Sequence, residues 1–123
     1  SLFVADFVGD SNLLDVVALT DGGEEARVRL GGAEISLPRG KAAKGAAKLM
    51  VRPNAINLHH TATPQSIAAR VTKASYIGKH MEYTIETPGG ELFAVGNVRA
   101  DSWKTGDDVH VEFDNHLVKL LQA

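Results

Sequence analysis

Short stretches of strictly alternating apolar and polar residues recur along this chain, and they constrain its fold more than any other feature. A period of two places successive side chains on opposite faces of a β-strand, so each stretch predicts a strand with one buried and one wet face. Glycine-rich turn sequences flank the stretches, which is typical of antiparallel strands joined by tight turns. The alternating stretches are ARVRL (26–30), AEISL (33–37), MEYTIE (81–86) and DVHVEFD (108–114). Together they predict a mainly β domain, either a small antiparallel barrel or a sandwich.

Two other stretches carry residues that favour helices. Residues 1–8 are apolar enough to be the last turn of a helix that begins upstream. KAAKGAAKLM (41–50) is rich in alanine and lysine, but Gly45 weakens a helix at this place. We therefore expect a loop over 41–50 with at most one helical turn.

An internal repeat relates the two halves of the chain. GGAEISL in the first half resembles GGELFAV in the second, and KGAAKLMVRPNAINL resembles KTGDDVHVEFDNHLVKL. In this alignment Gly45 and Asn54 are as far apart as Gly106 and Asn115. The repeat predicts two related antiparallel halves.

The repeat also sets the expected boundaries. The halves cover about 11–60 and 66–123, and HTATPQS (60–66) connects them.

The phrase VRPNAINL (51–58) has the apolar pattern of a strand but contains Pro53, which has no N–H to donate to a sheet. Proline in sheets is confined to strand edges, strand starts and bulges. The repeat indicates that Pro53-Asn54 is a corner between two strands, matched by Asp114-Asn115 in the second half.

Composition limits the classes of protein to consider. With 44% hydrophobic and 23% charged residues, the 123-residue chain has an ordinary soluble composition, and its length suits one domain or two very small ones that share a core. The absence of cysteine excludes disulfides and thiolate metal sites. A formal net charge of -2 argues against a nucleic-acid binder, which usually carries a basic face.

Targeting signals are absent from the sequence. No apolar run approaches the roughly 18 residues of a membrane span. The start SLFVADFVGD has no basic residues ahead of its apolar stretch, unlike a signal peptide. These apolar residues have nothing upstream to pack on, so we expect the chain to be a fragment or a domain that docks on another part.

Catalytic motifs are also missing. Neither Gly40-Lys41 nor Gly78-Lys79 has the glycine and hydroxyl residue that a Walker A loop requires, and GxGxxG does not occur. The five histidines lack the HExxH spacing, and no GxSxG nucleophile turn is present. We therefore expect no enzyme activity from this chain, no resident cofactor and no metal site.

Single-stranded nucleic-acid binding remains an alternative, because small barrels often bind it. It needs aromatic stacking platforms along a positive groove. The candidate residues for such a strip are Tyr76, Lys79, Tyr83, Trp103 and Lys104. Tyr83 is in phase with the buried face, so we favour a core tyrosine and a tryptophan that covers the barrel end, with no nucleic-acid partner.

Five phrases in order resemble one known family, the transport-associated OB (TOBE) domain at the C-terminus of ATP-binding subunits of bacterial ABC importers. The phrases are FVADFVGDSNLL (3–14), VRPNAINL (51–58), YIGKHMEYTI (76–85), GGELFAV (89–95) and TGDDVHVEFD (105–114). The resemblance covers nearly the whole chain and is closest to the branch that serves polyamines, ferric iron or phosphonates.

The resemblance implies an OB-like β-barrel over 11–123, preceded by the end of an ATPase domain or a linker over 1–10. It implies structural roles for the motif residues Gly9, Asn12, Arg52, Pro53, Asn54 and Gly106. Asn54 departs from the family, which usually has an acidic residue after Arg-Pro.

The resemblance also implies function and partners. The domain is expected to support contact between two copies of an ATPase subunit, and to sense a ligand or regulator. Expected partners are a second copy, the upstream ATPase domain and, through the parent protein, membrane permease subunits. ATP and Mg²⁺ belong to the missing ATPase domain, and the location is cytoplasmic, peripheral to the inner membrane.

A small-ligand module is a further alternative, because some TOBE domains bind oxyanions. Backbone N–H groups and small polar side chains at a subunit junction can hold an anion. The candidate residues are Ser75, Tyr76, Gly78 and Lys79. The competing interpretation is that Gly78 makes a hairpin turn and Lys79 is solvated.

Overall fold

The alternating stretches all form strands, as the pattern predicts, and their inward side chains are buried except for Ala33 and Met81, which are partly buried. The computed structural model describes residues 11–20, 26–37, 44–97, 102–114 and 118–122. The strands in these ranges are β1 (Asn12–Ala18), β2 (Ala26–Leu30), β3 (Ala33–Leu37), β4 (Gly45–Val51), β5 (Ile56–His59), β6 (Ile67–Ile77), β7 (His80–Thr87), β8 (Gly90–Asn97), β9 (Asp108–Phe113) and β10 (Val118–Gln122). A 3₁₀ turn, η1 (Pro53–Ala55), separates β4 from β5.

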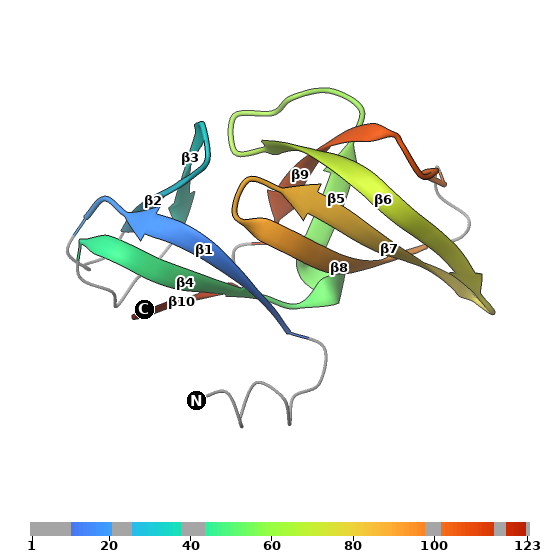
Figure 1. The fold of residues 1–123 in the computed structure, drawn as a ribbon, viewed down its shortest axis with the longest axis horizontal. Coiled ribbons are helices and arrows are strands. Elements are labelled where there is room, and N and C mark those ends of the chain that lie inside the picture. Colours follow the sequence, from blue (N-terminus) through green and yellow to red (C-terminus); the bar gives the residue numbers. More distant parts are fainter. Residues whose placement is uncertain (1–10, 21–25, 38–43, 98–101, 115–117, 123) are drawn as a thin grey trace.

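The strands form two antiparallel sheets of five strands each. The first sheet has the order β10-β4-β1-β2-β3 and the second has the order β5-β9-β6-β7-β8. Figure 1 shows the two curled sheets side by side, with β1 and β8 where they meet. The predicted mainly β class with two related antiparallel halves is confirmed.

Each half gives its last strand to the other half's sheet. β5 follows β4 in the chain but pairs with β9, and β10 follows β9 but pairs with β4. Apart from this exchange the two sheets have the same order of strands. Because each sheet needs a strand from the other half, the two halves fold as one unit.

The repeat exists, but its alignment differs from the one predicted. Buried Leu14 lies opposite Leu49, and buried Ile67 lies opposite Val111, so Leu49 corresponds to Val111. The predicted pairing of Gly45 with Gly106 is therefore displaced by one position from the alignment that the structure gives. Inward-facing residues can correspond only to inward-facing residues, and the glycine alignment breaks that rule.

The hairpin turns show the same kind of shift. The turn between β2 and β3 is Gly31-Gly32, and the turn between β7 and β8 is Pro88-Gly89. Gly31 therefore corresponds to Pro88, and the two Gly-Gly pairs of the sequence do not coincide.

These two turns pack against each other between the sheets. A Cβ on Gly31 would lie 2.2 Å from the Cβ of Pro88, and the φ of Gly31 is +62°. A Cβ on Gly89 would lie 2.6 Å from the backbone oxygen of Asp15. Only glycine allows both close approaches.

The expected loop over 41–50 is wrong for its second part. Gly45–Val51 is the strand β4, which pairs with β1 on one side and β10 on the other. Its inward residues Ala47, Leu49 and Val51 are buried, so tertiary pairing outweighs the helical preference of alanine and lysine. Residues 41–43 lie outside the described residues, as do residues 1–8 and Gly9.

The predicted corner at Pro53 is confirmed. Pro53 occupies the first turn of η1, where its missing N–H costs no hydrogen bond, and its side chain is buried. The backbone N–H of Ala55 closes the turn on the Arg52 carbonyl at 2.9 Å. Of the matching corner Asp114-Asn115, only Asp114 lies in the described residues. Its backbone N–H donates to the Ala55 carbonyl at 2.7 Å.

Asn12 joins the two sheets through its side-chain amide. Its Nδ2 donates to the carbonyls of Val51 at 3.1 Å and Phe93 at 2.9 Å, and its Oδ1 accepts from the Phe93 N–H at 2.7 Å. The side chain thus satisfies the free edge of β8 as a neighbouring strand would.

Gln65 makes a related contact in the other half. Its Oε1 accepts from the backbone N–H of Ser36 on the edge strand β3 at 2.7 Å. In the corrected alignment Gln65 corresponds to Asn12, and Ser36 corresponds to Phe93. Two side-chain amides therefore cover the two corresponding sheet edges.

The buried apolar residues form one cluster that contains members of both sheets. Trp103 belongs to this cluster and lies between β8 and β9 in the chain. Its backbone N–H donates to the hydroxyl of buried Tyr83 at 3.1 Å, and its indole contacts the His60 ring with 4.3 Å between ring centroids. Trp103 is the only tryptophan in the sequence, so its fluorescence reports on this contact.

Replacing Asn12 with alanine should lower the free energy of unfolding by about 2–3 kcal/mol, because three hydrogen bonds are lost and the Phe93 edge is left unpaired. Asn12→Asp should cost at least as much, since it turns a carboxylate toward two carbonyl oxygens. Urea unfolding followed by Trp103 fluorescence measures both changes. The control Asn57→Ala, on an exposed side chain, should stay within about 0.5 kcal/mol of the parent. An unchanged midpoint in Asn12→Ala would contradict the bridging role.

Replacing Tyr83 with phenylalanine should cost about 1 kcal/mol, because the buried Trp103 N–H loses its acceptor. The tryptophan emission should also move to longer wavelength as the indole becomes more hydrated. Tyr76→Phe is the matched control, since Tyr76 is 66% exposed and should change neither quantity. Equal effects from the two substitutions would show that the Tyr83 hydroxyl does not hold Trp103.

Candidate functional site

Hollows in the surface and one projecting hairpin are the features of the described part of the chain that offer contacts to a partner or ligand. The first hollow lies between β5 and β8, the two edge strands of the second sheet, and encloses about 430 Å³. Its lining residues are Asn54, Ile56, Asn57, Leu58, His59, His60, Tyr83, Ala94, Val95, Gly96 and Trp103.

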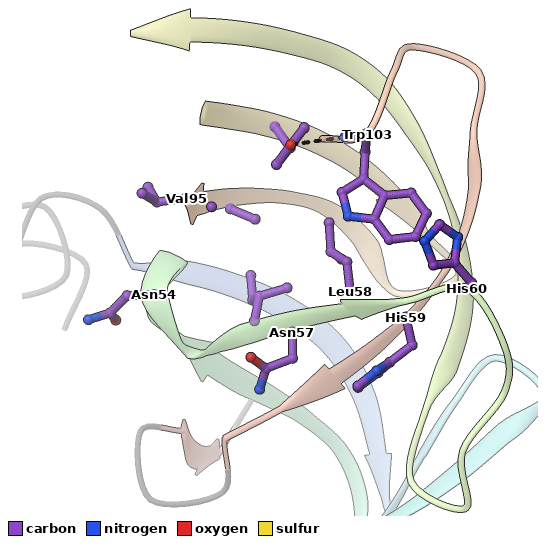
Figure 2. Close-up of a pocket in the computed structure, with 11 residues that line it drawn as sticks. Asn54, Asn57, Leu58, His59, His60, Val95 and Trp103 are labelled. Atoms are coloured by element: carbon purple, nitrogen blue, oxygen red, sulfur yellow. Dashed lines mark hydrogen bonds between the residues drawn. The ribbon is translucent and has the colours of Figure 1, made fainter. Parts of the chain in front are cut away.

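The polar groups of this hollow do not converge on one point. Figure 2 shows Leu58 and His59 on opposite sides of β5, with Leu58 toward Trp103 and His59 away from it. His59 instead lies 3.1 Å from Glu112, whose carboxylate also accepts from Thr63 at 3.0 Å. At the Trp103 end, the His60 ring covers the indole. The arrangement supplies a recess of mixed apolar and polar lining whose polar side chains lie apart from one another, and no catalytic constellation.

Besides Asn12, four of the motif residues lie in the described part of the chain. Arg52 is exposed and precedes η1, Pro53 is buried within it, and Asn54 is exposed on the rim of the first hollow. Gly106 has a φ of +97°, a value that disfavours other residues, and its N–H donates to the Val71 carbonyl at 2.7 Å.

The candidate ligand residues lie at the tip of the β6–β7 hairpin. Ile77 pairs with His80, so Gly78 and Lys79 form a two-residue turn, and Gly78 has a φ of +62°. Tyr76 is 66% exposed. Ser75 lines a shallow hollow of about 70 Å³. The ligand role of these residues stays a prediction.

The aromatic strip considered for nucleic acid is not formed. Tyr83 and Trp103 are buried, at 2% and 8% exposure, and only Tyr76 presents its ring to solvent. Stacking needs an exposed ring face, so two of the three platforms are lost.

The second hollow was not anticipated from the sequence. It encloses about 440 Å³ on the outer face of the first sheet, over β1 and β4. Its lining residues are Asp15, Val16, Val17, Arg29, Gly31, Ala46, Ala47 and Lys48. β1 itself was missed because NLLDVVA is apolar on both faces and therefore does not alternate.

Other kinds of site are not supported by the described residues. Within 11–20, 26–37, 44–97, 102–114 and 118–122, no three histidine or acidic side chains are grouped so that they could hold a metal ion. No helix in these ranges has the length and apolar character needed to cross a membrane.

Curated proteins similar to this chain are ATP-binding proteins of importers. The Fe(3+) ions import ATP-binding protein FbpC of Rhizobium etli is 36% identical over the whole chain, and FbpC 1 of Rhizobium meliloti is 37% identical. The spermidine/putrescine import ATP-binding protein PotA of Ruegeria pomeroyi is 29% identical over 98% of the chain. The chain spans about a third of the length of these proteins, 34–35% in each case.

A solved structure shares the fold. The cytoplasmic molybdate-binding protein ModG, with molybdate bound, superposes with a TM-score of 0.73 over 94% of this chain and 98% of its own, at 16% identity. This likeness confirms the OB-like fold.

The TOBE domain family matches residues 49–121, which include the η1 corner, the strands β5–β9 and most of β10. The resemblance seen in the sequence phrases is confirmed by this match and by the importer ATP-binding proteins to which the whole chain is similar. This chain belongs to the TOBE domain family.

Proposed function

We propose that the chain is the accessory domain of an ATP-binding subunit of an ABC importer, where it supports contact between two copies of that subunit. The observation that carries the proposal is similarity over the whole chain to importer ATP-binding proteins, together with the match to the TOBE domain family. The further partners are the upstream ATPase domain and, through the parent protein, the membrane permease. The location is cytoplasmic, at the inner membrane.

The proposed mechanism is mechanical. One core and an exchange of strands join the two halves, so the domain moves as a single body. Such a body holds two ATPase subunits together while their nucleotide sites open and close. A ligand or regulator that binds one arrangement better shifts the population toward it, and activity follows.

The catalytic groups belong to the ATPase domain in this proposal. ATP and Mg²⁺ bind there, and the chain of 123 residues has no cofactor of its own. Neither the hollow between β5 and β8 nor the hollow over β1 and β4 presents a phosphate-binding loop.

Residues 1–123 alone should hydrolyse no ATP in the presence of Mg²⁺, whereas the full-length protein should. The coding sequence upstream of Ser1 should contain a Walker A lysine and an LSGGQ-like signature. A phosphate-release assay on both proteins and the upstream sequence provide the check. Metal-dependent ATPase activity from residues 1–123, or an upstream sequence with neither motif, would contradict the proposal.

A second candidate is an oxyanion-binding module. The fold shared with the molybdate-binding protein ModG favours it, and the candidate residues remain Ser75, Tyr76, Gly78 and Lys79. Because these residues lie at an open hairpin tip, an anion there needs further groups, which a subunit junction would supply.

Calorimetric titration with molybdate, sulfate, phosphate and polyamines tests this candidate. We expect an oxyanion to give saturable heat that Lys79→Ala removes, because the ammonium group balances the anion's charge. Lys104→Ala, which removes an exposed lysine of another turn, should leave the binding heat unchanged. Flat titrations with every compound would end the oxyanion hypothesis and leave the accessory role untouched.

A further inference from the structure

The outer face of β1 and β4 has a composition unlike that of an ordinary solvated strand face. β1 carries apolar residues on both sides: Leu14 and Val16 are buried inside, while Leu13 and Val17 are 36% and 43% exposed outside. Strands that are apolar on both faces are typical of sheets covered on both sides. The described part of the chain covers only the inner side of β1.

The register between β1 and β4 arranges this outer face in three rows. Residues directly opposite each other in an antiparallel pair share a face. The rows are Leu13 with Met50, Asp15 with Lys48, and Val17 with Ala46. Two apolar rows thus flank one ion pair, in which Asp15 is 75% exposed and Lys48 44% exposed.

This pattern is complementary to itself. A two-fold axis that runs between β1 and β4, along the strands, places β1 of one copy over β4 of the other. Leu13 then meets Met50, Asp15 meets Lys48, and Val17 meets Ala46 of the second copy. Every row is paired with a suitable partner, as an isologous contact requires. Sheets that pack face to face keep their strands nearly aligned, so this axis fits ordinary sheet packing.

The second hollow lies where this contact needs space. It forms beside the Val17–Ala46 row because Ala46, Ala47 and Gly31 present small side chains or none. The opposing Val17 of a second copy enters this hollow and occupies part of it. The neighbouring Arg29 lies 3.5 Å from Glu34, a carboxylate that it shares with Arg27 at 2.5 Å, so these three side chains leave one net positive charge beside the hollow.

We infer that the outer face of β1 and β4, centred on Asp15 and Lys48, is the surface that binds a second copy of this chain. The inference rests on the proposed function, which requires contact between two copies, and it names the surface that makes the contact.

Charge reversal with mixing gives a sharp test. Sedimentation velocity over a concentration series should show that the 123-residue chain forms a dimer. Asp15→Lys alone and Lys48→Asp alone should each weaken that dimer about tenfold or more, because like charges then face each other across the axis. An equimolar mixture of the two variants should dimerise with nearly the parent affinity, since each supplies the charge that the other lacks.

The mixture separates the contact between copies from the ion pair within one chain. Both variants have lost their internal Asp15–Lys48 pair, so a purely structural role of that pair would leave the mixture as weak as its components. Val17→Lys should also weaken the dimer about tenfold or more, because it puts a cation into the apolar hollow. Ile77→Lys is the matched control: Ile77 is 46% exposed on the distant hairpin tip, and the dimer should be unaffected.

The outcomes distinguish this inference from the function on which it rests. A parent dimer that survives Asp15→Lys, Lys48→Asp and Val17→Lys overturns the assigned surface but keeps the homodimer. A mixture that stays as weak as its components, or an Ile77→Lys variant as weak as Val17→Lys, also overturns the surface. A parent chain that is monomeric at every concentration contradicts both the surface and the homodimer contact.

Discussion

The exchange of β5 and β10 between the two halves is the constraint on which the rest of the structure depends. A sheet of four strands from one half would leave β4 or β9 with an open edge, and open edges invite aggregation. The exchange covers one edge of each four-stranded unit with a strand from the other half. Asn12 and Gln65 cover corresponding edges with side-chain amides, and the turns at Gly31 and Pro88 pack where the sheets meet.

The sequence was most informative where each strand has one wet face. Strict alternation located β2, β3, β7 and β9, and the repeat indicated two related halves. The alternation pattern did not identify β1 and β4, and the physical reason differs between these two strands. β1 does not alternate because both of its faces are apolar, and β4 is rich in alanine and lysine, whose helical preference is overridden by pairing with two neighbours.

The repeat alignment shows a limit of glycine motifs. Glycines mark turns, and turns tolerate shifts of one residue that strands do not. Matching the inward-facing residues Leu49 and Val111 corrects the alignment. The long-range contacts were beyond the sequence, because nothing in the neighbourhood of Asn12 identifies Phe93 as its partner. The candidate surface was missed for the same reason: the three rows of β1 and β4 exist only once their register is known.

For an accessory domain, this architecture separates two tasks. The shared core makes the domain one rigid body, and the outer face of β1 and β4 is left free to contact a second copy. Asn12 begins β1, the strand that contributes Leu13, Asp15 and Val17 to that face, and also anchors β8 of the other sheet. The edge strand β8 beside the first hollow is thereby tied to the proposed dimer face through one side chain.

Native-state hydrogen exchange tests the central claim, that the strand exchange makes the two halves a single cooperative unit. The account predicts that the slowest amides of β4 in the first sheet and β9 in the second share one opening free energy, equal to the global free energy of unfolding. Weakening β10 by Leu120→Ala should lower both values together, although Leu120 packs in the first sheet. Opening free energies that differ between β4 and β9 by more than about 1 kcal/mol, or a loss confined to β4, would contradict the account.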